Sequence, residues 1–147
     1  MEYRIFTLGT SNRSLREFLT ELGQRNITQL IDVRSVPFSR LAWFSAPQIE
    51  RWSEWAGVLY RQEGAILGGR SNIRRFDPRY DAALSSIAKA AQMAAVAIFC
   101  AEGDPANCHR SWSIGAVMLQ KLRIDLVNIL RDGTEELMSE TLLRARR

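Results

Sequence analysis

The sequence predicts a single α/β domain of three layers, in which a mostly parallel sheet of about five strands is flanked by helices in a Rossmann-like arrangement. Segments with strand character alternate with segments of helical periodicity, a pattern typical of parallel sheets. The most apolar run, residues 94–101, has the length of a strand and no polar alternation, as expected for a strand covered on both faces. The 147 residues, 46% of them hydrophobic, suffice for one domain spanning 1–147.

The chain begins with a strand and a capped helix. Residues 3–8 form the first predicted strand, which ends at Gly9. Ser14 and Glu17 have the spacing of a capping box, so a helix is predicted to begin there. Apolar residues follow at helical spacing until Gly23, which supplies a stop signal.

The next unit repeats this order of strand and helix. Residues 27–33 form the second predicted strand, and residues 34–44 form a loop after it. A capping pattern at Ser45 predicts a helix that ends at Gly57. A short third strand is predicted at residues 58–60.

A long loop and a well-marked helix precede the most apolar strand. The loop spans residues 63–76 and is rich in glycine and arginine. Asp77 and Pro78 then form an N-cap followed by a first-turn proline. The expected buried face of this helix consists of Tyr80, Leu84, Ile87 and Ala91.

The last part of the chain follows the strand at 94–101. A loop at 102–107 leads into a largely apolar helix predicted for residues 108–122. Residues 124–130 form the last predicted strand. A helix is predicted for residues 134–147, with acidic residues early and arginines late, and we expect it to be peripheral to the domain.

Arginine dominates the charge of the chain. The formal net charge is +4, and Lys89 and Lys121 are the only lysines among 20 basic residues. The guanidinium fork suits phosphate and carboxylate groups, so the bias favours an anionic partner. A GC-rich genome would give the same bias through codon usage, and both explanations stay open at this point.

Composition also restricts the location of the protein. No apolar run approaches the roughly 18–20 residues that span a bilayer, and the N-terminus lacks the apolar region of a signal peptide. Two cysteines without an export signal are typical of reduced thiols. We therefore expect a cytoplasmic protein with no membrane association.

Polar segments that contain arginine follow four of the predicted strands. Ligands of parallel sheets bind at the carboxyl ends of the strands, so these segments are expected to form one anion-binding edge. The segments are residues 9–13, 32–40, 63–75 and 102–110.

Cys108, His109 and Arg110 lie at a predicted helix start. Free N–H groups there bind anions, and the helix dipole with a neighbouring cation lowers the pKa of a thiol, so Cys108 is a candidate nucleophile. Alternatively, Cys100 and Cys108 are small buried apolar residues and His109 is structural. A zinc site is disfavoured because adjacent Cys108 and His109 point in different directions on a helix.

Carboxylates and aromatic residues are further candidates for the functional site. Glu102 has no evident capping role and suits a general acid or base, whereas Asp32 either contacts a ligand or pairs with Arg34. The aromatic residues near position 50 are either core residues or a base-stacking surface. Walker, Gly-x-Gly-x-x-Gly and Gly-x-Ser-x-Gly sequences are absent, which counts against common nucleotide-dependent enzymes and serine hydrolases.

Four motifs in this order resemble the bacterial and archaeal family known as domain of unknown function 488. They are residues 7–12, 32–40, 67–70 and 100–111, and the resemblance extends from about residue 3 to residue 131. The resemblance implies an α/β fold and brings no established reaction. The first motif of the family usually reads Gly-His-Ser, and Thr10 replaces that histidine here. If the histidine takes part in chemistry, activity is expected to be altered or absent.

We expect a small enzyme, either a hydrolase or a transferase, that acts on an anionic nucleotide or nucleic-acid component. The expected site comprises catalytic Glu102, Cys108 and His109 and the binding residues Ser11, Asn12, Asp32, Arg34, Ser35, Gly69, Arg70 and Arg110. No metal or cofactor is expected. The rivals are a non-catalytic module that binds nucleic acid or a ligand, and chemistry at Cys108 similar to that of rhodaneses and cysteine phosphatases. The loop before Arg110 lacks the tight phosphate loop of those enzymes.

Overall fold

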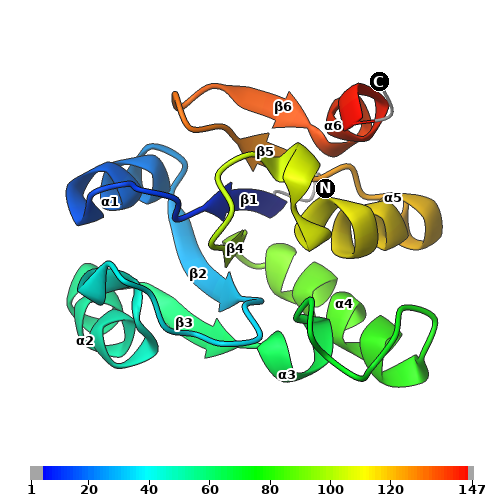
Figure 1. Cartoon of the computed structure of the whole chain (residues 1–147), viewed down its shortest axis with the longest axis horizontal. Helices are drawn as coiled ribbons and strands as arrows, with labels where there is room; N and C mark the ends of the chain where they lie inside the picture. Colours follow the sequence, from blue (N-terminus) through cyan, green and yellow to red (C-terminus); the bar gives the residue numbers. More distant parts are fainter. Residues whose placement is uncertain (1–4, 146–147) are drawn as a thin grey trace.

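A six-stranded sheet forms the middle layer of the protein, as the computed structural model, which describes residues 5–145, shows (Figure 1). The strand order is β3-β2-β4-β1-β5-β6, and only the last pair, β5 with β6, is antiparallel. The strands are β1 (Ile5–Gly9), β2 (Ile27–Asp32), β3 (Leu59–Gln62), β4 (Ala95–Cys100), β5 (Val127–Ile129) and β6 (Glu135–Leu137).

Helices cover both faces of the sheet, which confirms the predicted three-layer α/β fold (Figure 1). One face carries α1 (Leu15–Gln24) and α2 (Ala46–Ala56). The other face carries α3 (Gly64–Leu67), α4 (Pro78–Ala91), α5 (Ala116–Leu122) and α6 (Met138–Ala145). Short 3-10 turns, η1 (Ala42–Phe44) and η2 (Pro105–Asn107), and a π-helical segment, η3 (Arg110–Gly115), complete the chain. No helix within 5–145 is long and apolar enough to span a bilayer.

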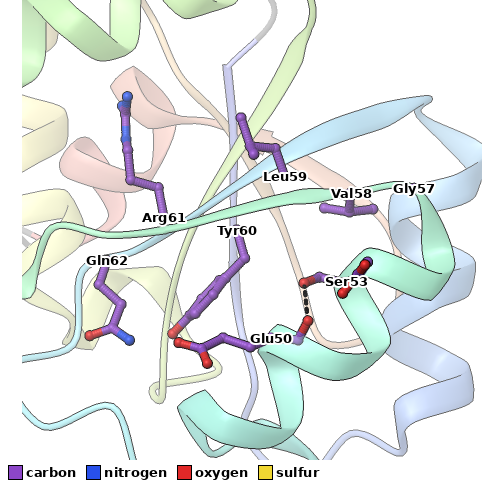
Figure 2. Close-up of a pocket in the computed structure, with 9 residues that line it drawn as sticks. Glu50, Ser53, Gly57, Val58, Leu59, Tyr60, Arg61 and Gln62 are labelled. Carbon is purple, nitrogen blue, oxygen red and sulfur yellow. Dashed lines mark hydrogen bonds between the residues drawn. The ribbon is translucent and has the colours of Figure 1, made fainter.

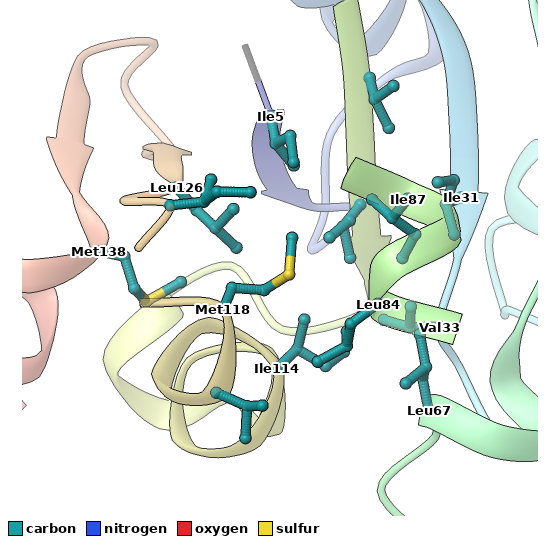
Figure 3. Packing of buried hydrophobic residues seen from close by; sticks show 14 of the residues in the cluster. Ile5, Ile31, Val33, Leu67, Leu84, Ile87, Ile114, Met118, Leu126 and Met138 are labelled. Atoms are coloured by element: carbon teal, nitrogen blue, oxygen red, sulfur yellow. The ribbon is translucent and has the colours of Figure 1, made fainter. Parts of the chain in front are cut away.

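Two hydrophobic cores hold the layers together. Figure 3 shows the core beneath α4 and α5, where Leu84, Ile114 and Met118 pack toward the sheet. The core beneath α1 and α2 is aromatic: the Phe18 ring makes edge contacts with Phe44 and Phe99, with ring centroids 4.9 and 5.9 Å apart. Side chains of β4 enter both cores, so the apolar run is indeed a strand covered on both faces.

Local sequence signals start and end several helices as predicted. Ser14 and Glu17 form the capping box of α1 through two reciprocal hydrogen bonds of 3.0 Å. Asp77 caps α4, and Gly57 adopts the left-handed conformation after α2. Ser45 is the N-cap residue of α2, as predicted, but its hydroxyl bonds to the main chain of Ser39 in the preceding loop and makes no capping bond to the helix.

The structure differs from the predicted elements at three places. The long loop contains the short helix α3, and the helix predicted to begin at Cys108 begins instead as the π-helical segment η3. The last predicted helix is wrong at its start, where β6 pairs with β5 before α6 begins. Met138 and Thr141 of α6 are fully buried, so α6 packs into the core rather than lying at the periphery. The outermost predicted residues, 3–4 and 146–147, lie outside the described range.

Candidate functional site

The loops after β1, β2 and β4 lie at the edge of the sheet where neighbouring strands connect to helices on opposite faces. From β1 and β2 the chain runs to α1 and α2 on one face, whereas from the intervening β4 it runs toward α5 on the other face (Figure 1). Loops that diverge in this way leave a crevice at the carboxyl ends of the strands, where ligands of α/β proteins bind. The main chain of Thr10 and Ser11 continues the β1–β4 pairing beyond the strands, with 2.8 Å bonds to the carbonyls of Cys100 and Ala101.

Three hollows open at this edge, and Glu102 lines all of them. The smallest has a volume of about 270 Å³ and is lined by Arg34, residues 100–102 and residues 107–109. The second, of about 830 Å³, lies between residues 10–12, 38–41 and 101–103. The third, of about 870 Å³, extends from Ser11 and Glu102 toward β5 and Arg144. The exposed carboxylate of Glu102 therefore stands at the junction of the hollows.

A pair of buried thiols closes the smallest hollow. Cys100 ends β4, Cys108 follows η2, and their Sγ atoms lie 2.8 Å apart as free thiols. Arg110 is fully buried, and its Nη1 donates to Cys100 Sγ at 2.9 Å and to the Glu102 carbonyl at 2.6 Å. The guanidinium of Arg110 thus fixes both the thiol pair and the loop that carries Glu102.

The two thiols differ in their ionisation. The hydrogen bond from Cys108, together with the charge of Arg110, outweighs the effect of burial and lowers the pKa of Cys100 to about 6. The same hydrogen bond and burial raise the pKa of Cys108. The expectation of a lowered pKa at Cys108 is therefore wrong, and Cys100, which accepts the hydrogen bond from Arg110, is the thiol whose ionised form the surroundings favour.

Arg34 enters the smallest hollow from the end of β2. Its Nε and Nη2 donate to the Asp32 carboxylate at 2.9 and 2.7 Å, and the Tyr60 hydroxyl donates to the same carboxylate at 2.6 Å. The guanidinium carbon lies 5.0 Å from the centre of the Phe99 ring. Although Arg34 is only 7% exposed, its Nη1 has no partner among the described residues. This buried donor is available to an acceptor in the hollow.

His109 completes the wall of the smallest hollow. Its Nδ1 lies 3.7 Å from Cys108 Sγ, and Gly69 lies against its ring. Burial lowers the pKa of His109 below its ordinary value, so the imidazole is neutral at pH 7. The side chain can therefore accept a proton from a group bound beside the thiols.

The family model for Domain of unknown function DUF488 matches residues 14–115. The chain belongs to the DUF488 family. No curated protein and no solved structure matches the chain. The matched range of this DUF488 protein contains the loops after β2 and β4 and the Gly68–Gly69 turn, whereas the segment with Thr10 precedes it.

The DUF488 structure brings most of the predicted site residues to one edge. Those that line the hollows are Ser11, Asn12, Arg34, Glu102, Cys108 and His109. Ser35 and Gly69 support the site instead: the Ser35 hydroxyl accepts from the Arg70 main chain at 2.8 Å, and a Cβ at Gly69 would lie 3.5 Å from the His109 ring. The Arg70 side chain is exposed, and Asn12 Oδ1 accepts from Arg131 at 3.0 Å.

Two residues of the DUF488 site have roles that sequence reasoning missed. Cys100 was expected to be a buried apolar residue, and only its contacts with Cys108 and Arg110 mark it as a thiolate. Arg13 is buried, and it donates to the carbonyls of Gly9 at 3.0 Å and Leu130 at 2.7 Å. Arg13 thus joins the ends of β1 and β5 rather than facing a ligand. An arginine close to a loop glycine is common in protein sequences, so no local signal distinguishes Arg13 from an arginine that binds a ligand.

A further hollow of about 730 Å³ lies outside this edge, between α2 and β3 (Figure 2). Tyr60 connects it with the DUF488 site through the hydrogen bond to Asp32. No group of three or more His, Cys, Asp or Glu side chains within residues 5–145 is arranged to hold a metal ion.

Proposed function

We propose that this DUF488 protein is an enzyme that binds an anionic substrate at the carboxyl edge of its sheet and transfers a group from it through Cys100. One observation carries the proposal: Arg34, whose buried Nη1 has no partner, and both cysteines of the thiol pair line the same hollow of about 270 Å³. A desolvated donor on a cation attracts an anion, and a thiolate beside it is a nucleophile.

The positive charge of the site supports recognition of an anion. Arg34 is held rigidly by Asp32, so little conformational entropy is lost when Nη1 binds an acceptor. Arg40 lines the adjoining hollow, and Arg70 is exposed on the turn that follows α3. Arg110 has a different role in this proposal, because its Nη groups donate to Cys100 and to main-chain carbonyls. It positions the thiolate and does not bind phosphate.

The sizes of the hollows suggest a substrate with an anionic head and a larger body. The hollow of about 270 Å³ has room for a small group such as phosphoryl or carboxylate. The body would lie in the hollow of about 830 Å³, where Ser11 and Asn12 offer polar groups and Phe38, which is 63% exposed, offers an aromatic face. A nucleotide or a nucleic-acid component has this combination of anion, polar groups and flat ring.

The proposed reaction has two balanced steps. The thiolate of Cys100 forms a bond to the electrophilic atom of the anionic group, and the leaving group departs with its electron pair and takes a proton from solvent. Water or another acceptor then attacks that atom and gives its proton to neutral His109, while the thiolate leaves as before. Arg110 and the Cys108 thiol stabilise the negative charge on Cys100 at both stages.

Alkylation with charged and neutral reagents tests the anion site directly. The rate at which iodoacetate modifies Cys100 is divided by the rate for iodoacetamide, and the same ratio is measured on the urea-unfolded chain. We expect the folded ratio to exceed the unfolded ratio by about tenfold, because the site attracts anions. Inorganic phosphate and nucleoside monophosphates should slow both reagents. Equal ratios without protection by any anion would refute the anion site.

Two variants separate binding from catalysis. Arg34→Lys keeps the charge near Asp32 but loses the fork, so we expect the iodoacetate preference to fall toward the unfolded ratio. Arg61→Lys, at a half-buried arginine on β3 outside the three hollows, is the matched control and should keep the preference. A panel of nucleotides and oligonucleotides is then assayed for turnover with wild type and with Cys100→Ala, which lacks the nucleophile of the proposed reaction and should show no turnover. Binding that falls steeply with salt, without turnover, would favour a non-catalytic binding module instead.

A further inference from the structure

Cys100 and Cys108 are placed to react with each other as well as with a substrate. We propose that they form a peroxide-oxidisable dithiol site, in which a small hydroperoxide converts the two thiols into an internal disulfide. In the group transfer Cys108 only donates a hydrogen bond to Cys100, but a thiol in such close contact with a second thiol can also form a bond to it. Since the chain has two cysteines, this disulfide is the only intramolecular one that can form.

The geometry of the pair requires little movement. The sulfurs lie 2.8 Å apart, and a disulfide bond has a length of about 2.05 Å. The seven-residue connection between the cysteines contains the exposed residues Ala101, Glu102 and Asn107, so it can adjust without disturbing the core. The Cys100 end is anchored in β4 and the Cys108 end by the turn η2, which keeps the thiols together in the reduced protein.

The chemistry is balanced with hydrogen peroxide as the oxidant. Cys100 thiolate attacks one peroxide oxygen, the O–O bond breaks, and the products are Cys100 sulfenic acid and hydroxide, which takes a proton from solvent. The Cys108 sulfur then attacks the Cys100 sulfur, loses its proton, and releases water as the disulfide forms. In total two thiols are oxidised and one peroxide is reduced to two waters.

The surroundings favour Cys100 as the sulfur that reacts first. Arg110 donates to Cys100 Sγ at 2.9 Å and stabilises its negative charge. Both cysteines line the hollow of about 270 Å³, so a molecule as small as hydrogen peroxide has access although each residue is at most 5% exposed. His109, with Nδ1 3.7 Å from Cys108 Sγ, is placed to accept the proton that Cys108 loses.

Oxidation should inactivate the site, an expectation that rests on the proposed function. A disulfide removes the thiolate that the group transfer needs, so the oxidised protein should be inactive until a thiol reductant restores it. Formation of the disulfide does not itself depend on any substrate. A chain that forms the disulfide but transfers no group would retain this inference and refute the proposed function.

The experiment uses the whole chain with hydrogen peroxide and trypsin. Cleavage after Lys89 and Arg110 leaves both cysteines in one peptide, residues 90–110. After peroxide treatment of the folded protein, we expect the two cysteines of this peptide to lose two hydrogens, to resist alkylation, and to regain both thiols with a reductant. The exposed Met93 in the same peptide gains an oxygen independently, so fragmentation assigns each mass change to its residue. Treatment of the urea-unfolded chain shows the background reaction. A folded chain whose cysteines gain oxygen atoms and form no internal disulfide would overturn the proposal.

Serine variants then assign the two roles. Cys108→Ser should stop at the sulfenic acid of Cys100, which dimedone traps, because no second thiol is present. In Cys100→Ser, we expect Cys108 to be oxidised at least about tenfold more slowly than Cys100 is in Cys108→Ser, because the Cys108 thiol is protonated and has lost its partner. Circular dichroism checks that both variants fold. Faster oxidation of Cys100→Ser than of Cys108→Ser would overturn the assignment of Cys100 as the sulfur that reacts first. If a variant does not fold, analysis of the wild-type peptide still shows whether the disulfide forms.

Discussion

Replacing Gly9 by alanine should damage the site through the main chain. Gly9 ends β1, and a Cβ at this position would lie 1.8 Å from the Glu102 carbonyl oxygen and 2.9 Å from Gly103 Cα. No side-chain rotation relieves this clash, so the loop at 101–103 must move. Overpacking costs about 1–3 kcal/mol, and a backbone clash belongs at the upper end of that range. For a chain of this length, about 3 kcal/mol lowers the Tm by about 6–12 °C.

Gly23→Ala is the matched control for this substitution. Gly23 lies in α1 with no atom within 4 Å of its added Cβ, and alanine stabilises a helix by about 0.5–1 kcal/mol relative to glycine. Calorimetry should therefore show a slightly raised Tm for Gly23→Ala and the large decrease for Gly9→Ala. Folded Gly9→Ala should also alkylate Cys100 more slowly, because Arg110 binds the displaced Glu102 carbonyl. A wild-type Tm and alkylation rate for Gly9→Ala would refute this reasoning.

Three further predictions concern the fold. Ser14→Ala removes one bond of the capping box and should reduce the free energy of unfolding in urea by about 1 kcal/mol. Leu84→Ala leaves a cavity beneath α4 and should reduce it by about 2–5 kcal/mol; a loss below that of Ser14→Ala would contradict the described packing. Arg144 lowers the pKa of Glu136, so this pair stabilises the fold above about pH 4.5 and the stabilisation is lost as the pH falls. Arg144 also pairs with Asp104, so Arg144→Ala should flatten the acid side of the stability–pH curve through both carboxylates, and an unchanged curve would show that these ion pairs contribute nothing.

Local signals predicted the parts of the fold that depend on local interactions. Ser14 with Glu17 and Asp77 with Pro78 place helix starts because the bonds they make span only a few residues. The strand β6 was missed because Glu135–Leu137 is short, polar and partly exposed, and it forms only by pairing with β5. The π-helical start of η3 was also missed, because the largely apolar sequence that begins at Cys108 carries no signal that separates a π-helix from an α-helix.

The location of the site could be predicted, but the roles of its arginines could not. The alternation of strands and loops in the sequence is sufficient to place Arg34 and Glu102, which follow β2 and β4, at the carboxyl edge of the sheet. Whether an arginine binds a ligand or the protein depends on acceptors distant in sequence. Arg13 finds such an acceptor at Leu130, and Arg110 finds its acceptors on the loop that contains Glu102. Part of the arginine excess therefore stabilises strand ends, which charge counting does not reveal.

The pH dependence of Cys100 alkylation tests the central claim, that Cys100 is the thiolate of the site, most directly. Iodoacetamide rates are measured across pH, and the modified residue is identified in the peptide of residues 90–110. We expect modification at Cys100 with a midpoint at a pH of about 6 in the wild-type protein. In Cys108→Ser the midpoint should be higher, because a serine hydroxyl replaces the thiol donor. A midpoint near the ordinary thiol value of about 8.5, or modification of Cys108 first, would contradict the account.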